Sequence, residues 1–178
     1  MPTKAKGPTS ASASRPKIRL ERTFQVSAKE VWELWTTKEG LESWWGPEGF
    51  TTTVHRLDLR PGGEFEYAMT ATRSDLIQGM KAAGLPLTSV AHGTYTEVTR
   101  PRRLAYTTLV DFIHGVASYE VAAVVEILPV GRGVRMVVTE DAMHDELWTE
   151  RSTMGMNSSL DRLAKVLESR LGTRRTSR

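Results

Sequence analysis

The sequence of 178 residues contains no cysteine, which excludes disulfides, thiolate metal sites and cysteine nucleophiles and agrees with a reducing compartment. No stretch approaches the roughly 18 consecutive apolar residues of a membrane-spanning helix. The first 17 residues also lack the apolar centre of a secretory signal. We therefore expect a cytoplasmic protein with no membrane segment. The length and the 39% hydrophobic content suffice for one domain with a buried core.

Acidic residues are missing from both ends of the chain. Residues 1–17 and 170–178 together carry eight of the 24 lysines and arginines and no acid, so the body between them is net acidic although the whole chain is +3. Both ends are rich in small and polar residues. We therefore predict disordered basic tails at residues 1–16 and 171–178, flanking a domain at residues 17–170. Basic tails on an acidic body argue against a specific nucleic-acid reader.

Motifs of the common catalytic and metal-binding classes are also missing. The four histidines are dispersed, and no nucleophile elbow, phosphate-binding glycine-rich loop or dinucleotide fingerprint occurs. We therefore expect no metal and no cofactor. Asp145 and Glu146 fall at the start of the last predicted helix, where carboxylates cap free N–H groups. Asp111 and His114 in "DFIHG" could form a general-base pair, but no nucleophile is positioned beside them.

Periodicity predicts one strand, two short helices, a run of strands and a long helix. Residues 17–26 alternate as a half-buried strand, and Ser27 with Glu30 forms a capping box before two short helical segments. From Phe50 the period becomes two, which predicts an antiparallel meander that ends with "VRMVVTE". Residues 71–90 interrupt it with a short amphipathic helix, which we interpret as an insertion that could act as a lid.

The last predicted element is a helix over about residues 145–170 whose packed stripe changes character along its length. The C-terminal half carries, at helical spacing, Leu160, Leu163 and Leu167. Toward the N-terminus the same phase continues with Met156, then Thr153 or Ser152, then Thr149 or Trp148. We expect the leucines to seal a core and the other half to face a cavity, the alternative being a polar helix end.

Four sequence blocks follow one another in order between residues 18 and 167: "VWELWTTKEGLESWWGPEGF", "DLRPGGEFEYAM", "GTYTEVTRPRRLAYT" and "SLDRLAKVL". Through them the chain resembles the Aha-type family, the proteins similar to the activator of the heat-shock protein 90 ATPase, within the START-like (SRPBCC) superfamily. The resemblance implies an α+β helix-grip fold. In that fold a curved antiparallel sheet wraps around the long C-terminal helix, and two short helices follow the first strand.

The adjacent tryptophans of "WWGP" pose a question of placement, because neighbouring side chains diverge and cannot fill one slot. The resemblance places this loop at the rim of a cavity between sheet and long helix. We expect one indole in the core and the other at the mouth, unless both serve only packing. Inward strand positions carry aromatic, methionine and hydroxyl side chains, which suit an apolar ligand or a plain core. The candidate ligand-binding residues are Trp35, Trp44, Trp45, Phe65, Tyr67, Met69, Tyr95, Tyr106, Thr108, Phe112, His114, Trp148, Ser152 and Met156.

The leading hypothesis is non-catalytic binding of a small apolar or aromatic molecule in an internal cavity. The alternatives are a chaperone-regulator-like protein-binding module, which the family name suggests, and an enzyme of the cyclase or hydrolase type that the superfamily contains. A sizeable closed cavity would favour the first, an exposed apolar patch the second, and a buried acid or histidine inside the cavity the third. The expected partners are a small hydrophobic molecule or a chaperone, with no specific nucleic acid and no membrane, for a monomer or dimer.

Overall fold

The computed structural model describes residues 14–176, which form one seven-stranded antiparallel sheet and four helices. The elements in chain order are β1 (Lys17–Phe24), α1 (Ala28–Thr36), α2 (Lys38–Trp44), β2 (Phe50–Leu57), β3 (Glu64–Ala71), α3 (Ser74–Ala82), β4 (Thr88–Thr99), β5 (Arg103–Val110), β6 (Tyr119–Val130), β7 (Gly133–Asp141) and α4 (Glu146–Thr176). The strands lie in the order β1-β7-β6-β5-β4-β3-β2, so the chain returns to pair its last strand with its first. The predicted order of elements and the antiparallel meander are confirmed.

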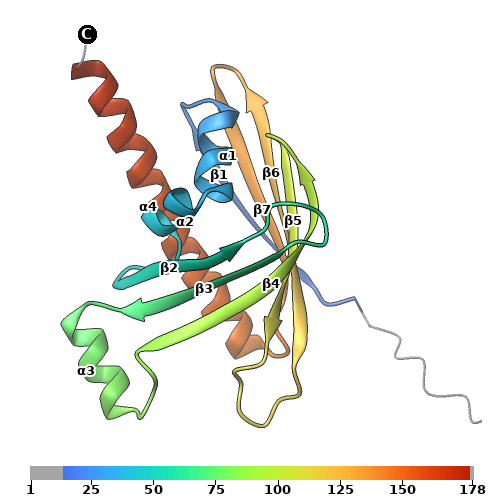
Figure 1. Ribbon diagram of the computed structural model, residues 1–178, viewed down its shortest axis with the longest axis vertical. Coiled ribbons are helices and arrows are strands. Elements are labelled where there is room, and N and C mark those ends of the chain that lie inside the picture. The colour runs from blue at the N-terminus through green and yellow to red at the C-terminus, as the bar shows by residue number, and fades with distance from the viewer. Residues whose placement is uncertain (1–13, 177–178) are drawn as a thin grey trace, which may run out of the picture.

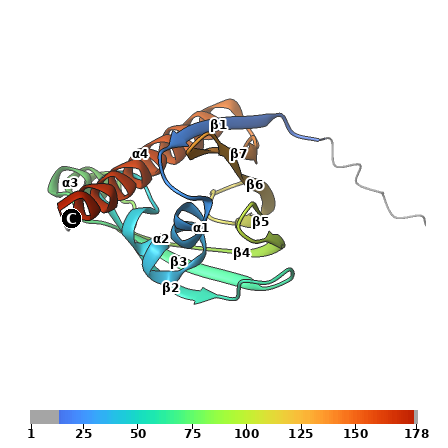
Figure 2. The ribbon, with the colours of Figure 1, turned by 90° about the horizontal axis from the view of Figure 1, so that it is seen from above.

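The sheet curves around three of the helices (Figure 1). Seen from above, it runs from β1 round to β2, with α1 and α2 inside the curve and α4 across its open side (Figure 2). α4 contacts β1 and α2, and α1 contacts β6. This is the helix-grip arrangement that the resemblance implied. Within residues 14–176, no helix is long and apolar enough to cross a membrane.

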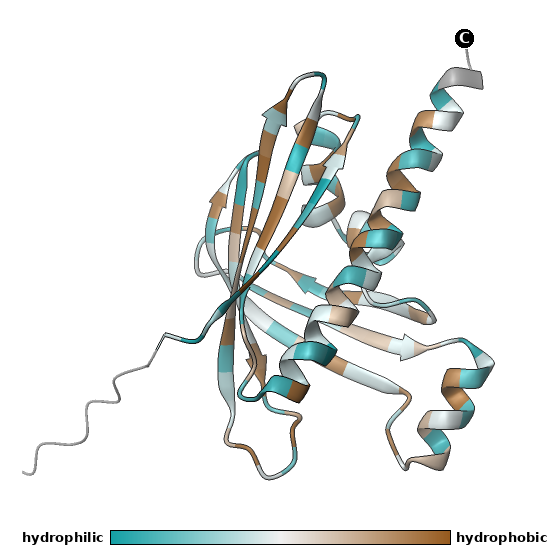
Figure 3. Cartoon of the chain, turned by 180° about the vertical axis from the view of Figure 1, so that it is seen from behind, coloured by the Kyte–Doolittle hydropathy of each residue, from teal (hydrophilic) through white to brown (hydrophobic). Residues whose placement is uncertain are grey.

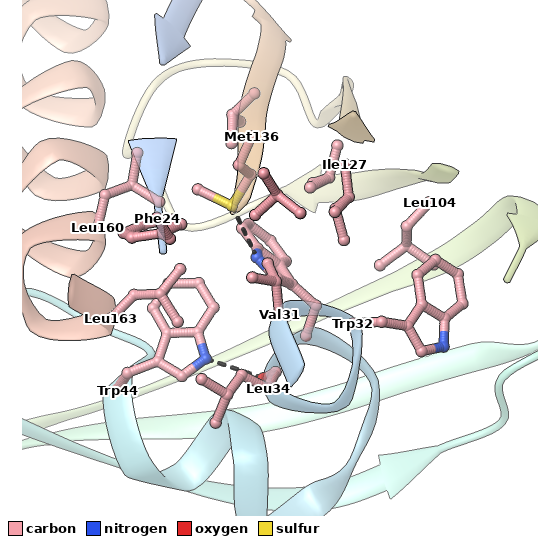
Figure 4. Close-up of a cluster of buried hydrophobic side chains, with 14 of the residues drawn as sticks. Phe24, Val31, Trp32, Leu34, Trp44, Leu104, Ile127, Met136, Leu160 and Leu163 are labelled. Carbon is pink, nitrogen blue, oxygen red and sulfur yellow. Dashed lines mark hydrogen bonds between the residues drawn. The ribbon is translucent and has the colours of Figure 1, made fainter. Parts of the chain in front are cut away.

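The core lies between the concave face of the sheet and the helices α1, α2 and α4 (Figure 4). In Figure 3, α4 alternates between hydrophobic and hydrophilic residues along its length. Its buried side is the predicted leucine stripe: Leu160, Leu163 and Leu167. β6 contributes every second residue to the core, as a strand with one buried face requires, whereas β5 and β7 also bury consecutive residues. The expected role of the C-terminal half of α4 in sealing the core is therefore confirmed.

The predicted starts of α1 and α4 have the expected caps. The Ser27 side chain accepts from the Glu30 N–H, and the Glu30 carboxylate accepts from the Ser27 N–H, which completes the capping box of α1. At the start of α4, Asp145 Oδ1 accepts from the Trp148 N–H at 2.8 Å. Asp145 therefore has a structural role in satisfying a free helix donor.

The C-terminal helix is longer than expected. α4 continues to Thr176, so the predicted tail at residues 171–178 begins too early. In this last part of the helix, Arg174 pairs with Glu30 of α1 at 2.8 Å. This ion pair gives the end of α4 a tertiary contact, which local composition does not reveal.

The N-terminal boundary also lies earlier than expected. The Arg15 guanidinium lies 4.5 Å from the centre of the Tyr119 ring and donates to the Glu120 carbonyl at 2.9 Å. The chain therefore contacts the sheet before β1 begins. The remaining parts of the two predicted tails, residues 1–13 and 177–178, lie outside the described residues.

The segment between β3 and β4 forms a short helix, as predicted. α3 contains no buried residue, and in Figure 1 this helix lies apart from the sheet. Its N-terminal end is tied to the loop after α2, because the N–H of Thr72 donates to the Gly49 carbonyl at 2.8 Å.

Candidate functional site

A narrow pocket opens on the concave side of the sheet, between the short helices and β2, β3 and β5. Five of the candidate side chains line it: Trp35, Trp45, Phe65, Tyr67 and Tyr106. Its volume is about 30 Å³, enough for two or three ordered water molecules at roughly 10–15 Å³ each. Pockets for drug-sized ligands measure roughly 300–1,000 Å³. In this conformation the pocket is therefore too small to be the sizeable closed cavity expected from the sequence.

The two adjacent tryptophans occupy different environments. Trp44 is fully buried, and its Nε1 donates to the Leu34 carbonyl at 2.8 Å (Figure 4). Trp45 is only partly buried and lines the pocket. The rings meet edge to face at 5.1 Å between centroids, with 86° between their planes. One indole therefore lies in the core and the other lines the pocket.

The loop that carries Trp45 is fixed in place by its backbone. Gly46 has φ +97°, and a Cβ there would lie 3.2 Å from Thr52 Oγ1 and 3.3 Å from Met69 Sδ. This position therefore needs glycine on grounds of both conformation and space. From α4, the Arg162 guanidinium donates to the carbonyls of Gly46 at 2.8 Å and Phe50 at 3.0 Å.

Aromatic rings from three strands continue the wall behind the pocket. The Phe65 ring lies 5.2 Å from Tyr95 and 5.6 Å from Tyr106, both edge-on or tilted. Burial raises the pKa of the Tyr95 and Tyr106 phenols, so both remain protonated donors. Among the described residues, neither hydroxyl has a hydrogen-bond partner. Burial also raises the pKa of Tyr67, and the nearby Trp45 indole lowers it by less; the two rings meet edge to face at 5.9 Å between centroids.

A buried carboxyl group, Glu140, lies among these residues and was missed by the sequence analysis. It occupies the inward phase of β7 after Val134, Met136 and Val138, and only 7% of it is exposed. The nearby Ser152 hydroxyl of α4 lowers the pKa of this carboxyl, but by less than burial raises it. Burial, and then the charge of Asp141, raises the pKa of Glu140 to about 7. The sequence did contain a signal for this burial: in "VRMVVTE", Glu140 continues a series of every second residue whose first three members are apolar and point inward.

Several candidate residues lie near the pocket without lining it. Trp44 and Tyr95 belong to the buried core, Met69 lies beneath Gly46, and Thr108 is partly buried on the concave face opposite Val121. On α4, Ser152 reaches Glu140, and Met156 packs partly buried against the core.

Three candidates lie away from it. Phe112 is 61% exposed, and its ring stands 5.9 Å from that of Trp148. His114 is exposed in the connection between β5 and β6. The suggested Asp111–His114 base pair does not form, because the carboxylate of Asp111 instead approaches Nε2 of His92 at 3.2 Å. Throughout residues 14–176, no group of three or more acidic or histidine side chains could hold a metal ion.

Comparison with known proteins identifies the relatives of this chain. Residues 25–168 match the model of the family described as activator of Hsp90 ATPase homolog 1-like protein. No curated protein matches the chain. Crystal structures that resemble it include a protein from Chromobacterium violaceum, which is 24% identical with a TM-score of 0.71 over 85% of this chain and 96% of the other.

Two further crystal structures are similar. A protein from Nitrosomonas europaea is 26% identical, with a TM-score of 0.67 over 86% of this chain and 95% of the other. The AHSA1 protein from Silicibacter pomeroyi is 22% identical, with a TM-score of 0.69 over 87% of this chain and 99% of the other. These likenesses agree with the helix-grip architecture.

Proposed function

The chain belongs to the activator of Hsp90 ATPase homolog 1-like family, and we propose that it binds a small apolar or aromatic molecule without catalysis. The proposed site is the aromatic pocket on the concave face of the sheet, extended by movement of Trp45 toward the N-terminal half of α4, which contributes no residue to the pocket itself. The observation that carries this proposal is the aromatic lining of the pocket, to which five side chains contribute: Trp35, Trp45, Phe65, Tyr67 and Tyr106.

Buried polar groups in folded proteins are normally hydrogen-bonded. The hydroxyls of Tyr95 and Tyr106 have no partner within residues 14–176 and are not among its fully buried unpaired atoms, so they keep access to solvent and are open to a ligand atom. A ligand with one or two polar atoms on an apolar body would satisfy the hydroxyls and cover the aromatic walls together. That pairing of apolar area with a few polar contacts is typical of small-molecule sites.

Entry of such a ligand requires movement at Trp45. The pocket of about 30 Å³ is too small for an aromatic ring, and Trp45 is its partly buried tryptophan. Its loop is held by Arg162, so the side chain rather than the backbone is expected to move. The indole would give up its edge-to-face contact with the Tyr67 ring when it moves.

Titration with an environment-sensitive apolar dye tests the proposal. We expect one saturable site and a melting temperature that rises with dye concentration, as mass action requires. Met156→Ala should weaken dye binding more than it destabilises the fold, whereas Leu163→Ala should chiefly destabilise, because Leu163 is fully buried. Absence of any saturable dye binding to the folded protein, together with equal destabilisation by the two variants, would refute the proposal.

Exposed apolar side chains favour a second candidate, a chaperone-regulator-like protein-binding module. Phe112, Leu147 and Met154 are 61%, 53% and 71% exposed at or near the N-terminal end of α4. Met154 also borders an open groove of about 680 Å³ beside the end of β7. If Met154→Ser removes dye binding and Met156→Ala does not, the outer groove is the binding surface.

Glu140 is the observation that favours the third candidate, a cyclase- or hydrolase-type enzyme. A carboxyl with a pKa of about 7 can serve as a general acid or base near neutral pH. Chemical conversion of a bound compound by the wild type, lost in Glu140→Gln, would replace the non-catalytic proposal.

A further inference from the structure

We propose that the ligand bound at the proposed site carries an amine, and that Glu140 is the residue that recognises its positive charge. This inference rests on the proposed function, because it names the chemical class of the molecule bound at the same site.

The first argument is the position of Glu140 on the sheet. In the registers of β1, β7, β6 and β5, Ile18, Glu140, Ala123 and Tyr106 lie opposite one another in a single row across the concave face. Neighbouring strands lie about 4.8 Å apart, so Ala123 separates Glu140 from Tyr106 with only a methyl group. Two long polar side chains therefore flank a short one, and Ser152 of α4 lies close enough to the carboxyl to act on its pKa.

The second argument is the absence of a counter-ion. Glu140 is 7% exposed and forms no ion pair with any of the described residues. On the same face, Arg22 lies opposite Met136 rather than Glu140, and its Nη2 donates to Asn157 at 3.0 Å and Asp161 at 3.1 Å. Buried carboxylates are normally paired, since an isolated buried charge is strongly disfavoured. A cationic ligand would supply the missing partner.

The third argument is the composition of the walls. Trp45, Phe65 and Tyr67 present aromatic rings in the pocket. Ring faces attract ammonium groups and also accept apolar bodies. Glu140 lies outside this lining, but its charge raises the pKa of two phenols that belong to it, Tyr67 and Tyr106. A carboxylate beside an aromatic pocket favours an amine on an apolar body over a neutral alcohol or amide, because a charge-assisted hydrogen bond is the stronger one.

The titration of Glu140 gives the inference a pH dependence. The groups that act on its carboxyl are the Ser152 hydroxyl from α4, the Tyr67 and Tyr106 phenols from β3 and β5, and Asp141 on its own strand. Its pKa of about 7 means that it is protonated in mildly acidic solution and ionised above neutrality. An ammonium ion pairs with the ionised form, so amine affinity should rise with pH through this range.

Calorimetric titration with a matched pair of probes tests the inference. The probes are 2-phenylethylamine and 2-phenylethanol, which share a ring and a two-carbon chain and differ in the terminal group. At about pH 8 we expect the wild type to bind the amine about tenfold more tightly than the alcohol. Amine affinity should fall about tenfold at about pH 5.5, while alcohol affinity stays constant.

The variants assign the preference to one carboxyl. Glu140→Gln keeps the shape of the side chain and should bind both probes with equal affinity at both pH values. The control is Glu120→Gln on the outward face of β6, where the side chain is exposed. It should keep the wild-type preference. Circular dichroism establishes that each variant is folded.

The outcomes separate the inference from the proposed function. Equal affinities for the two probes in the wild type, or a preference that survives in Glu140→Gln, would overturn the amine recognition and leave ligand binding in place. Binding of neither probe by the folded wild type would overturn both.

Discussion

Replacing Glu140 by glutamine should change how the stability of the fold depends on pH. In the folded protein the pKa of this carboxyl is about 7, raised from 4.5 by burial. A raised pKa means that the protonated form stabilises the fold, fully below about pH 4.5, and that this contribution is lost as pH rises through about 7. The difference corresponds to about 3 kcal/mol. Glu140→Gln cannot ionise, so it should become more stable than the wild type by up to that amount as pH rises.

Urea denaturation of the wild type and Glu140→Gln between about pH 4.5 and pH 8 measures this difference. Other titrating groups are common to both proteins and largely cancel. Glu120→Gln, on the exposed face of β6, should follow the wild-type curve at all pH values. Parallel curves for the wild type and Glu140→Gln would show that the buried carboxyl is not held in the protonated form near neutrality, and would refute the reasoning.

The remaining predictions concern packing. Leu163→Ala should lower the free energy of unfolding by about 2–5 kcal/mol, because removing a fully buried leucine side chain leaves a cavity. Replacing the exposed Asp161 by alanine should cost under about 1 kcal/mol. Equal losses in urea denaturation would mean that α4 packs by another face. Gly46→Ala should cost more than about 1 kcal/mol by the same measurement, since φ is +97° and the site is crowded; an unchanged midpoint would contradict the close packing. Arg162→Gln should release the loop after α2 and increase its amide hydrogen exchange, because the guanidinium contacts four backbone carbonyls there, those of Trp45, Gly46, Pro47 and Phe50. Unchanged protection would show that these contacts do not hold the loop.

Local patterns were sufficient to predict most of the fold. The alternation of β1 and β7, the Ser27–Glu30 capping box and the leucine stripe of α4 depend on residues a few positions apart. Each therefore has a signal in a short stretch of sequence. The same holds for Trp44 and Trp45, because diverging neighbours must enter different environments.

The parts that were missed depend on contacts between distant segments. Glu140 ends a strand pattern, and its place in a row with Tyr106 follows only from how β5, β6 and β7 pair. Arg162 reaches carbonyls more than a hundred residues away, which no helical period indicates. The sequence also did not indicate that α4 continues past Gly172, because glycine disfavours helix. Near the end of this helix Arg174 forms an ion pair with Glu30 of α1, a tertiary contact that a local pattern cannot show.

The site shows the same division. Trp35, Trp45, Phe65, Tyr67 and Tyr106 line one pocket because they belong to inward phases of α1, β3 and β5 or to the loop beside them. Phe112 and His114 belong to the connection between β5 and β6, which has no regular secondary structure. Its sequence therefore has no periodicity from which its path could be predicted, and this path places both residues away from the pocket.

Binding inside the cavity is tested most directly by the indole N–H signals of the protein during titration with 2-phenylethylamine, followed by nuclear magnetic resonance. Trp45 lines the inner pocket, whereas Trp148 lies on the first turn of α4 against exposed Phe112. We predict that the Trp45 signal moves with one saturable dissociation constant and that the Trp148 signal stays in place. Movement of Trp148 with Trp45 unchanged would place the ligand on the outer surface and contradict the proposed cavity site.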